Sequence, residues 1–299
     1  MFVSLVAFLL QPCFGLLPDP LQRRLHKCRR QMSDTHLILD ADAVRKFRAR
    51  QKEFQSQATQ PLTALAPISL EVQEGECVVF FGPSGCGKST LLNIIAGFEA
   101  PSTGEILLED KPVTGPGNDR LMLFQEHGLF PWLNVIKNVM YGLKNQPGYR
   151  FRLHKQRDAA RAWLRLMHLE EFEKSRVHEL SGGMKQRVAL ARALAPDPTV
   201  LLIDEPFPAL DALVRTKLYG DLQEIMERTR KTIISVTHDP REAACLGDRV
   251  LVFTPRPGRI EKEIRVDLPR PRDINDAAVG DYANQIMAAL EKSDEKQPG

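Results

Sequence analysis

Residues 82–90 read Gly-Pro-Ser-Gly-Cys-Gly-Lys-Ser-Thr, and this stretch decides the fold. Its spacing is G-x-x-x-x-G-K-[ST], the pattern of a loop whose backbone N–H groups surround the phosphates of a nucleotide. The apolar run Cys77–Phe81 precedes it, and residues 89–97 read as a helix after it. Because a helix N-terminus attracts anions, this order predicts a phosphate site and not a structural glycine-rich turn. The residues predicted to contact nucleotide are Gly82, Pro83, Ser84, Gly85, Cys86, Gly87, Lys88, Ser89 and Thr90.

Two carboxylates end a second apolar run and extend the predicted site. Residues 200–203 read Val-Leu-Leu-Ile, and Asp204 and Glu205 follow directly. Parallel α/β sheets bind ligands at the carboxyl ends of their strands. There Ser89 and Asp204 are suited to hold Mg²⁺, Glu205 to activate water as a general base, and Lys88 to reach the β- and γ-phosphates. A solvated acidic turn is the alternative for the acidic pair alone.

The hydrophobic pattern predicts an α/β fold. Residues 78–81, 200–203 and 232–236 are apolar without alternation, as in parallel strands that are covered on both faces. Residues 68–72 and 104–109 alternate, which predicts a smaller antiparallel layer. The spacing of apolar residues over 155–167 is helical. We therefore expect an inserted helical subdomain between two stretches of the sheet, and further strands over 250–253 and 260–266.

Composition excludes several classes of protein. With 43% hydrophobic and 26% charged residues among 299, the chain has an ordinary globular composition. A formal net charge of +3 is too small to indicate nucleic acid as a main partner. The five cysteines are scattered without the spacing of metal ligands, which is typical of reduced cytosolic thiols.

The first 31 residues differ from the rest. Residues 2–17 are mostly apolar, and a group of arginines and a lysine follows them, whereas a secretory signal carries its positive charge first. The run is also too short to span a bilayer comfortably. We interpret residues 1–31 as an extension of doubtful role or a misassigned start before Met32, with a membrane-touching segment as the alternative.

A third motif, Leu180-Ser181-Gly182-Gly183-Met184-Lys185-Gln186-Arg187, predicts a second helix start shaped for phosphate. Ser181 is a good N-cap, and Gly182 and Gly183 leave the backbone open to an anion. An ordinary capped helix is the alternative. Together with the phosphate loop and the acidic strand end, however, the motif indicates function.

On these ordered motifs, residues 36–270 resemble the ATP-binding subunit of an ABC transporter. The resemblance implies a P-loop NTPase (RecA-like) core with a mainly parallel sheet, an antiparallel layer and an inserted helical subdomain. The expected ATPase domain is 32–270, with a core of 32–125 and 192–270 and a helical subdomain of 126–191; residues 271–299 would form a C-terminal helix and a polar tail. ATP and Mg²⁺ are the implied ligands.

The resemblance also implies that two copies clamp ATP between them. Ser181, Gly182 and Gly183 of one copy would then touch the γ-phosphate held by the other, and Asp211 would meet its counterpart across the dimer. Gln125 corresponds to the glutamine that contacts Mg²⁺, and His238 to the histidine at the γ-phosphate. The aromatic residue that stacks on adenine would be Phe47, with Phe54 as its competitor. Catalysis is thus assigned to Glu205, His238, Gln125 and Lys88.

Two segments and one residue resemble the branch of this family that imports nitrate, sulfonates and taurine. They are residues 125–133, Met184, and Thr254-Pro255-Arg256-Pro257-Gly258-Arg259-Ile260. The implied partners are membrane permease subunits and, indirectly, a solute-binding protein, with the chain at the cytoplasmic face of the membrane. One residue departs from the pattern, because Pro208 stands where the relatives carry glycine, which bears on the hydrolysis rate. A soluble ABC ATPase without a permease and a nucleotide-dependent regulatory module are the alternatives.

Overall fold

The computed structural model describes residues 37–41, 64–124, 128–205 and 212–294. Its residues fall into two compact units. One consists of Leu129–Pro196 and is helical; the other holds the remaining described residues and both sheets. The predicted positions at residues 1–31, Phe47, Phe54, Gln125, Pro208 and Asp211 lie outside the described residues.

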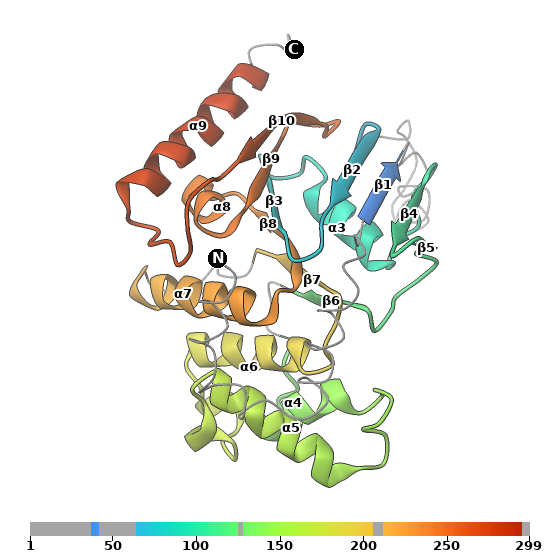
Figure 1. Ribbon diagram of the computed structural model, residues 1–299, viewed down its shortest axis with the longest axis vertical. Helices are drawn as coiled ribbons and strands as arrows, with labels where there is room; N and C mark the ends of the chain where they lie inside the picture. Colours follow the sequence, from blue (N-terminus) through green and yellow to red (C-terminus); the bar gives the residue numbers. More distant parts are fainter. Residues whose placement is uncertain (1–36, 42–63, 125–127, 206–211, 295–299) are drawn as a thin grey trace, which may run out of the picture. The chain divides into compact units, whose positions relative to one another are not determined.

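The larger unit contains a six-stranded sheet in the order β10-β9-β3-β8-β7-β6 (Figure 1). All neighbouring pairs are parallel except β9 and β10, which are antiparallel. The strands are β3 (Cys77–Phe81), β6 (Arg120–Leu123), β7 (Val200–Asp204), β8 (Thr232–Thr237), β9 (Arg249–Phe253) and β10 (Ile260–Arg265). The predicted α/β fold with a mainly parallel sheet is confirmed.

A second sheet in the same unit is antiparallel, as the alternating segments predict. Its order is β2-β1-β4-β5. Strand β2 (Ile68–Val72) shows strict alternation of buried and exposed residues, so one face packs inward and the other meets solvent. The remaining strands are β1 (Leu37–Ala41), β4 (Glu105–Leu108) and β5 (Lys111–Pro112).

The strands of the large sheet are buried on both faces, which explains their continuous apolar runs. Val78 and Phe80 join a core with α3 (Lys88–Ala96) and the inward face of the antiparallel sheet. The alternate residue Val79 points to the other face, where it lies close to Gly247 beyond the end of α8 (Pro240–Leu246). Helices α7 (Ala212–Thr229) and α9 (Ala277–Asp294) both pack against α8.

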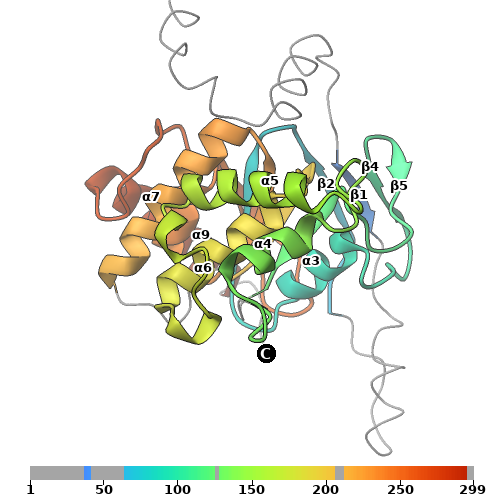
Figure 2. The ribbon, with the colours of Figure 1, turned by 90° about the horizontal axis from the view of Figure 1, so that it is seen from below.

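The helical unit is built from α4 (Val135–Leu143), α5 (Leu153–Leu166) and α6 (Gly182–Leu194), with short 3₁₀ turns at Glu170–Phe172 and Val177–Glu179. These three helices pack against one another (Figure 2). Helix α4 begins at the N-cap Asn134, whose side chain accepts a hydrogen bond from the Lys137 N–H. Over the part of the chain that the structure describes, no helix has the length and apolar character needed to cross a bilayer.

Candidate functional site

The phosphate loop joins the carboxyl end of β3 to the start of α3. Gly87 is the N-cap of α3, with φ of 109°, in the left-handed region that favours glycine. A Cβ at this position would lie 2.6 Å from Leu65 Cδ2, so the space also requires glycine. Because Gly87 has no side chain to cap α3, the first turn of the helix offers its N–H groups to an anion.

The Lys88 ammonium lies inside this loop. Its Nζ donates hydrogen bonds to the carbonyl oxygens of Gly82 at 2.7 Å and Pro83 at 2.8 Å, and the Cys86 Sγ is 3.7 Å away. The residue is only 5% exposed, since the loop closes around it. The structure therefore has a positive charge where the sequence predicts phosphate, held by carbonyls that a phosphate can replace as its partners.

Two oxygen ligands meet next to the loop. The Ser89 hydroxyl donates a hydrogen bond to Asp204 Oδ1 at 3.1 Å, although the two residues are 115 positions apart along the chain. Burial raises the pKa of the Asp204 carboxyl above its ordinary value, and the hydrogen bond from Ser89 opposes that shift. A hydroxyl and a carboxylate are the hard oxygen donors that suit Mg²⁺, which commonly completes its coordination with water and nucleotide phosphates.

Glu205 and His238 form the third part of the site. They follow β7 and β8, which are parallel neighbours, so both side chains emerge at the same edge of the sheet. His238 Nδ1 lies 3.0 Å from Glu205 Oε1. Glu205 has φ of 44°, a left-handed conformation that is costly for a residue with a side chain, and its N–H donates to the Val236 carbonyl at 3.1 Å. This pair can accept a proton from water and orient it.

A pocket of about 200 Å³ opens at this edge. Residues of the loop and the acidic strand end line it together: Ser84, Gly85, Gly87, Lys88, Ser89 and Glu205. The structure thus brings together the phosphate loop, Asp204 and Glu205, which two separate motifs predict, and His238, which the family resemblance implies.

The helical unit contains the third predicted motif. Ser181 is the N-cap of α6, and its hydroxyl accepts a hydrogen bond from the Met184 N–H at 3.3 Å. The predicted N-cap is therefore confirmed. Ser181 is exposed, whereas Gly183 is buried in the first turn.

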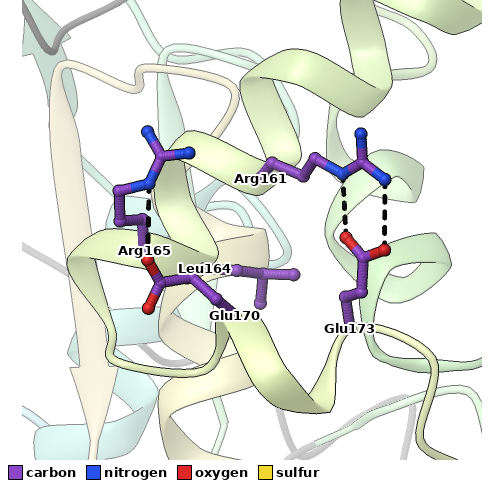
Figure 3. A pocket seen from close by; sticks show the side chains of 5 residues that line it. All are labelled: Arg161, Leu164, Arg165, Glu170 and Glu173. Carbon is purple, nitrogen blue, oxygen red and sulfur yellow. Dashed lines mark hydrogen bonds and ion pairs between the residues drawn. The ribbon is translucent and has the colours of Figure 1, made fainter.

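A larger hollow in the helical unit, of about 310 Å³, is a less suitable ligand site (Figure 3). Arg161 donates to both carboxylate oxygens of Glu173 at 2.8 and 3.1 Å. Arg165 forms an ion pair with Glu170 at 3.4 Å. Figure 3 shows the two ion pairs on either side of Leu164, with each arginine directed at its own glutamate, so these charges are already neutralised.

Sequence reasoning missed two residues near the site. Glu242, in the first turn of α8, is buried and accepts a hydrogen bond from Thr237 Oγ1 at 2.6 Å, directly before His238. Burial is the main cause that raises the pKa of Glu242 to about 7. Arg256 donates to the carbonyl oxygen of Gly85 in the phosphate loop. The sequence signal for Arg256 was the motif 254–260, which follows the strand next to β3.

Comparisons with known proteins point to one family. Residues 65–208 match the family described as ABC transporter. An uncharacterized ABC transporter ATP-binding protein of Methanocaldococcus jannaschii is 46% identical over 76% of this chain and 84% of its own length. A taurine import ATP-binding protein of Burkholderia pseudomallei is 48% identical over 70% and 79%. An aliphatic sulfonates import ATP-binding protein of Bacillus cereus is 39% identical over 86% and 97%.

Solved structures share the fold. A dimeric ATP-binding cassette in a post-hydrolysis state with ADP and phosphate has a TM-score of 0.64 at 29% identity, covering 78% of this chain and 100% of its own. A second dimeric structure of a bacterial ABC transporter cassette also gives 0.64, at 30% identity, with coverage of 79% and 100%. With a complete phosphate loop, an acidic strand end beside a histidine and relatives matched over most of their length, this chain belongs to the ATP-binding subunits of ABC transporters and is an ATPase.

Proposed function

We propose that this ATPase drives an importer for a small oxyanionic organic or inorganic solute, of the sulfonate, taurine or nitrate type. One observation carries the hydrolytic part: the Glu205–His238 pair stands at the same sheet edge as the phosphate loop, with Glu205 in the wall of its pocket. The cargo is inferred from the taurine and aliphatic sulfonates importers, which are 48% and 39% identical to this chain.

Within the site, each described side chain has one proposed role. Lys88 and the backbone N–H groups of the phosphate loop bind the phosphates and stabilise the charge that develops during transfer. Glu205 accepts the proton of the attacking water, and His238 orients Glu205 and the γ-phosphate. Ser89, Asp204 and Gln125 would hold Mg²⁺, which neutralises phosphate charge when it is bound. The Ser89–Asp204 hydrogen bond supports this assignment, because it pairs two of the three proposed ligands.

The complete site would need a second copy of the chain. In this proposal Ser181, Gly182 and Gly183 of the partner contact the γ-phosphate, Asp211 contacts the opposite loop, and Phe47 stacks on adenine. The dimeric state of the structural neighbours supports such pairing. Residues 32–270 then form the ATPase domain, with 126–191 as its helical subdomain, and residues 271–299 follow it.

The remaining partners follow from the importer role. Permease subunits would dock at the cytoplasmic face of the membrane, and a solute-binding protein would deliver cargo to them from the other side. An aromatic cluster of the helical unit supports a docking surface: the half-buried Phe130 lies 4.5 Å from Tyr141 and 5.4 Å from Trp132 between ring centroids, and Tyr141 and Trp132 are 50% and 68% exposed.

Exchanging Glu205 for glutamine tests the hydrolytic role. Glu205→Gln should lower the rate of ATP hydrolysis by at least about a hundredfold while leaving ATP binding intact, because only the proton acceptor is lost. Loaded with MgATP, the variant should elute as a dimer in size-exclusion chromatography. Glu291→Gln, on the exposed surface of α9, is the matched control and should keep the wild-type rate. Wild-type turnover by Glu205→Gln would refute the assignment.

Reconstitution tests the cargo. The chain would be placed in proteoliposomes with a permease and a solute-binding protein, and ATP-driven uptake of labelled taurine, an alkanesulfonate, nitrate, a cation and a sugar would be measured. Uptake of one of these solutes that stops with Glu205→Gln supports the proposal. Uptake confined to a cation or a sugar would overturn it.

A further inference from the structure

The turn between β9 and β10 lies against the phosphate loop. Its six residues, 254–259, are closed by hydrogen bonds between the Thr254 N–H and the Arg259 carbonyl at 3.0 Å, and between the Arg259 N–H and Thr254 Oγ1 at 3.2 Å. A Cβ at Gly258 would lie 2.0 Å from the Cys86 carbonyl oxygen. Since only glycine fits there, the turn and the loop are in close backbone contact.

The segment before β2 holds the turn in place. The Gly258 N–H donates to the Ala64 carbonyl at 3.0 Å, and the Ala66 N–H donates to the Gly258 carbonyl at 2.8 Å. Between them, Leu65 is buried and packs where a side chain at Gly87 would stand. The phosphate loop therefore has a fixed support on the side of Gly85, Cys86 and Gly87.

From this turn, Arg256 reaches one atom of the loop with two donors. Its Nε and Nη2 donate to the Gly85 carbonyl oxygen at 3.1 and 2.7 Å. Hydrogen bonds from a charged donor are stronger than those between neutral groups. Within the described residues, no ion pair joins Arg256 to an acidic side chain, so its positive charge remains available beside the loop.

This contact controls which way a peptide group of the loop points. In a trans peptide the C=O of Gly85 and the N–H of Cys86 point in opposite directions. With the carbonyl held by Arg256, the Cys86 N–H is directed at the Pro83 carbonyl, 3.4 Å away, which also accepts the Lys88 ammonium. The N–H and the ammonium thus share the interior of the loop, where phosphate oxygens would bind.

We propose that Arg256 is a positioning residue for nucleotide phosphates. It keeps the Gly85 carbonyl oxygen turned away from the bound phosphates, so that the Cys86 N–H faces them, and it adds positive charge at the rim of the site. This proposal rests on the phosphate-binding role proposed for residues 82–90. It gives the motif 254–260 a function within this chain, separate from any contact with a permease.

The test compares two arginines of the same turn. In Arg256→Met, affinity for MgADP, measured by titration calorimetry, should fall about three- to tenfold, the range of an exposed charge-assisted hydrogen bond. The KM for MgATP should rise by the same factor with kcat within about twofold of wild type, since the loss is in binding. Arg259→Met removes an equal charge from an exposed side chain at the last position of the same turn, which makes no hydrogen bond or ion pair with the loop within the described residues, and should change neither value.

Two further variants make the outcomes decisive. Arg256→Lys, which keeps the charge and one donor, should recover part of the lost affinity, and the deficit of Arg256→Met should narrow in high salt. Circular dichroism and thermal unfolding check that the fold is intact, which the exposed position of Arg256 favours. Unchanged MgADP affinity in Arg256→Met, or a fall in kcat alone, overturns the role of Arg256. Unchanged affinity in Lys88→Ala would instead refute the phosphate site itself.

Discussion

The N-termini of α3 and α6 are capped in different ways. At α3 the N-cap is Gly87, in a left-handed conformation and without a capping side chain. At α6 the N-cap is Ser181, in an extended conformation, and its hydroxyl already satisfies the Met184 N–H. A helix start without a cap retains its N–H donors for a ligand, whereas a capped start is stable by itself. We therefore expect the N-terminus of α3 to bind phosphate more strongly than that of α6.

The largest effect should come from removing the charge at the uncapped start. Lys88→Ala should weaken MgATP affinity at least about a hundredfold, because the loop loses the only side-chain cation that it encloses and retains only backbone donors. Lys185→Ala, in the first turn of α6, is the matched control. Equilibrium titration of the monomer should give wild-type MgATP affinity for Lys185→Ala. Equal losses of affinity in both variants would contradict the proposal that α3, and not α6, binds the phosphates in the monomer.

The glycine cap should be the next most sensitive. Gly87→Ala should destabilise the fold by about 1–3 kcal/mol, since alanine is strained at φ of 109° and its Cβ would meet Leu65. Gly220→Ala, inside α7 where a Cβ meets nothing within 4 Å, should instead stabilise by about 0.5–1 kcal/mol. Urea unfolding measures both. A Gly87→Ala protein as stable as wild type would contradict the structure of this cap.

The N-terminus of a third helix, α8, contains a carboxyl group, Glu242, that should make stability depend on pH. Asp239 caps it by accepting from the N–H groups of Arg241 and Glu242. Glu242 lies in the first turn, and the charged and titratable groups around it are Asp239 and His238 in the preceding loop, Arg215 and Tyr219 on α7, and Cys245 on α8. Burial outweighs the cations among them and raises the pKa of Glu242 from 4.5 to about 7.

Glu242 should make the protein more stable at low pH than at high pH. Because the folded pKa lies above the unfolded one, the folded state retains a proton that the unfolded chain loses. This stabilisation is complete below about pH 4.5 and is lost as pH rises through about 7, so that about 2 kcal/mol should disappear between about pH 5 and 8. Glu242→Gln should flatten the profile of unfolding free energy against pH. The exposed Glu227→Gln should keep the wild-type slope; equal slopes in all three proteins would rule out the effect.

The smallest loss of stability is expected at the N-cap of α6, Ser181. Ser181→Ala should cost about 1 kcal/mol of stability, the usual value of an N-cap hydroxyl. Ser181→Asn restores a cap and should recover that stability without restoring a hydroxyl for the γ-phosphate. Thermal unfolding and steady-state hydrolysis separate the two roles. If Ser181→Asn hydrolyses ATP at the wild-type rate, the hydroxyl acts only as a cap.

The sequence predicts those parts of the site that are encoded in contiguous motifs. The phosphate loop, Asp204, Glu205 and Ser181 each lie in a short pattern with one structural solution. Strand β6 shows the opposite case, because it starts with a charged residue, Arg120, whose buried guanidinium pairs with the Asp119 carboxylate at 2.7 Å and donates to the Gly115 carbonyl. The apolar run that follows, Leu121-Met122-Leu123-Phe124, is too short to distinguish a strand from part of a buried helix.

Contacts between distant residues were also beyond sequence reasoning. The hydrogen bonds from Arg256 to Gly85 link positions 171 residues apart, and they exist only because β9 lies next to β3 in the sheet. The burial of Glu242 likewise depends on α7 packing against α8. Residue type and spacing show which groups such positions carry, but not which distant residues those groups contact.

The backbone at Glu205 has an evolutionary consequence. A φ of 44° suits glycine and asparagine better than glutamate. Replacing Glu205 with either residue should therefore relieve backbone strain and raise the melting temperature. Selection for thermal resistance alone would therefore favour sequences without the acidic side chain that hydrolysis is proposed to need. The presence of glutamate in this conformation is what selection for turnover, and not for thermal stability, would produce.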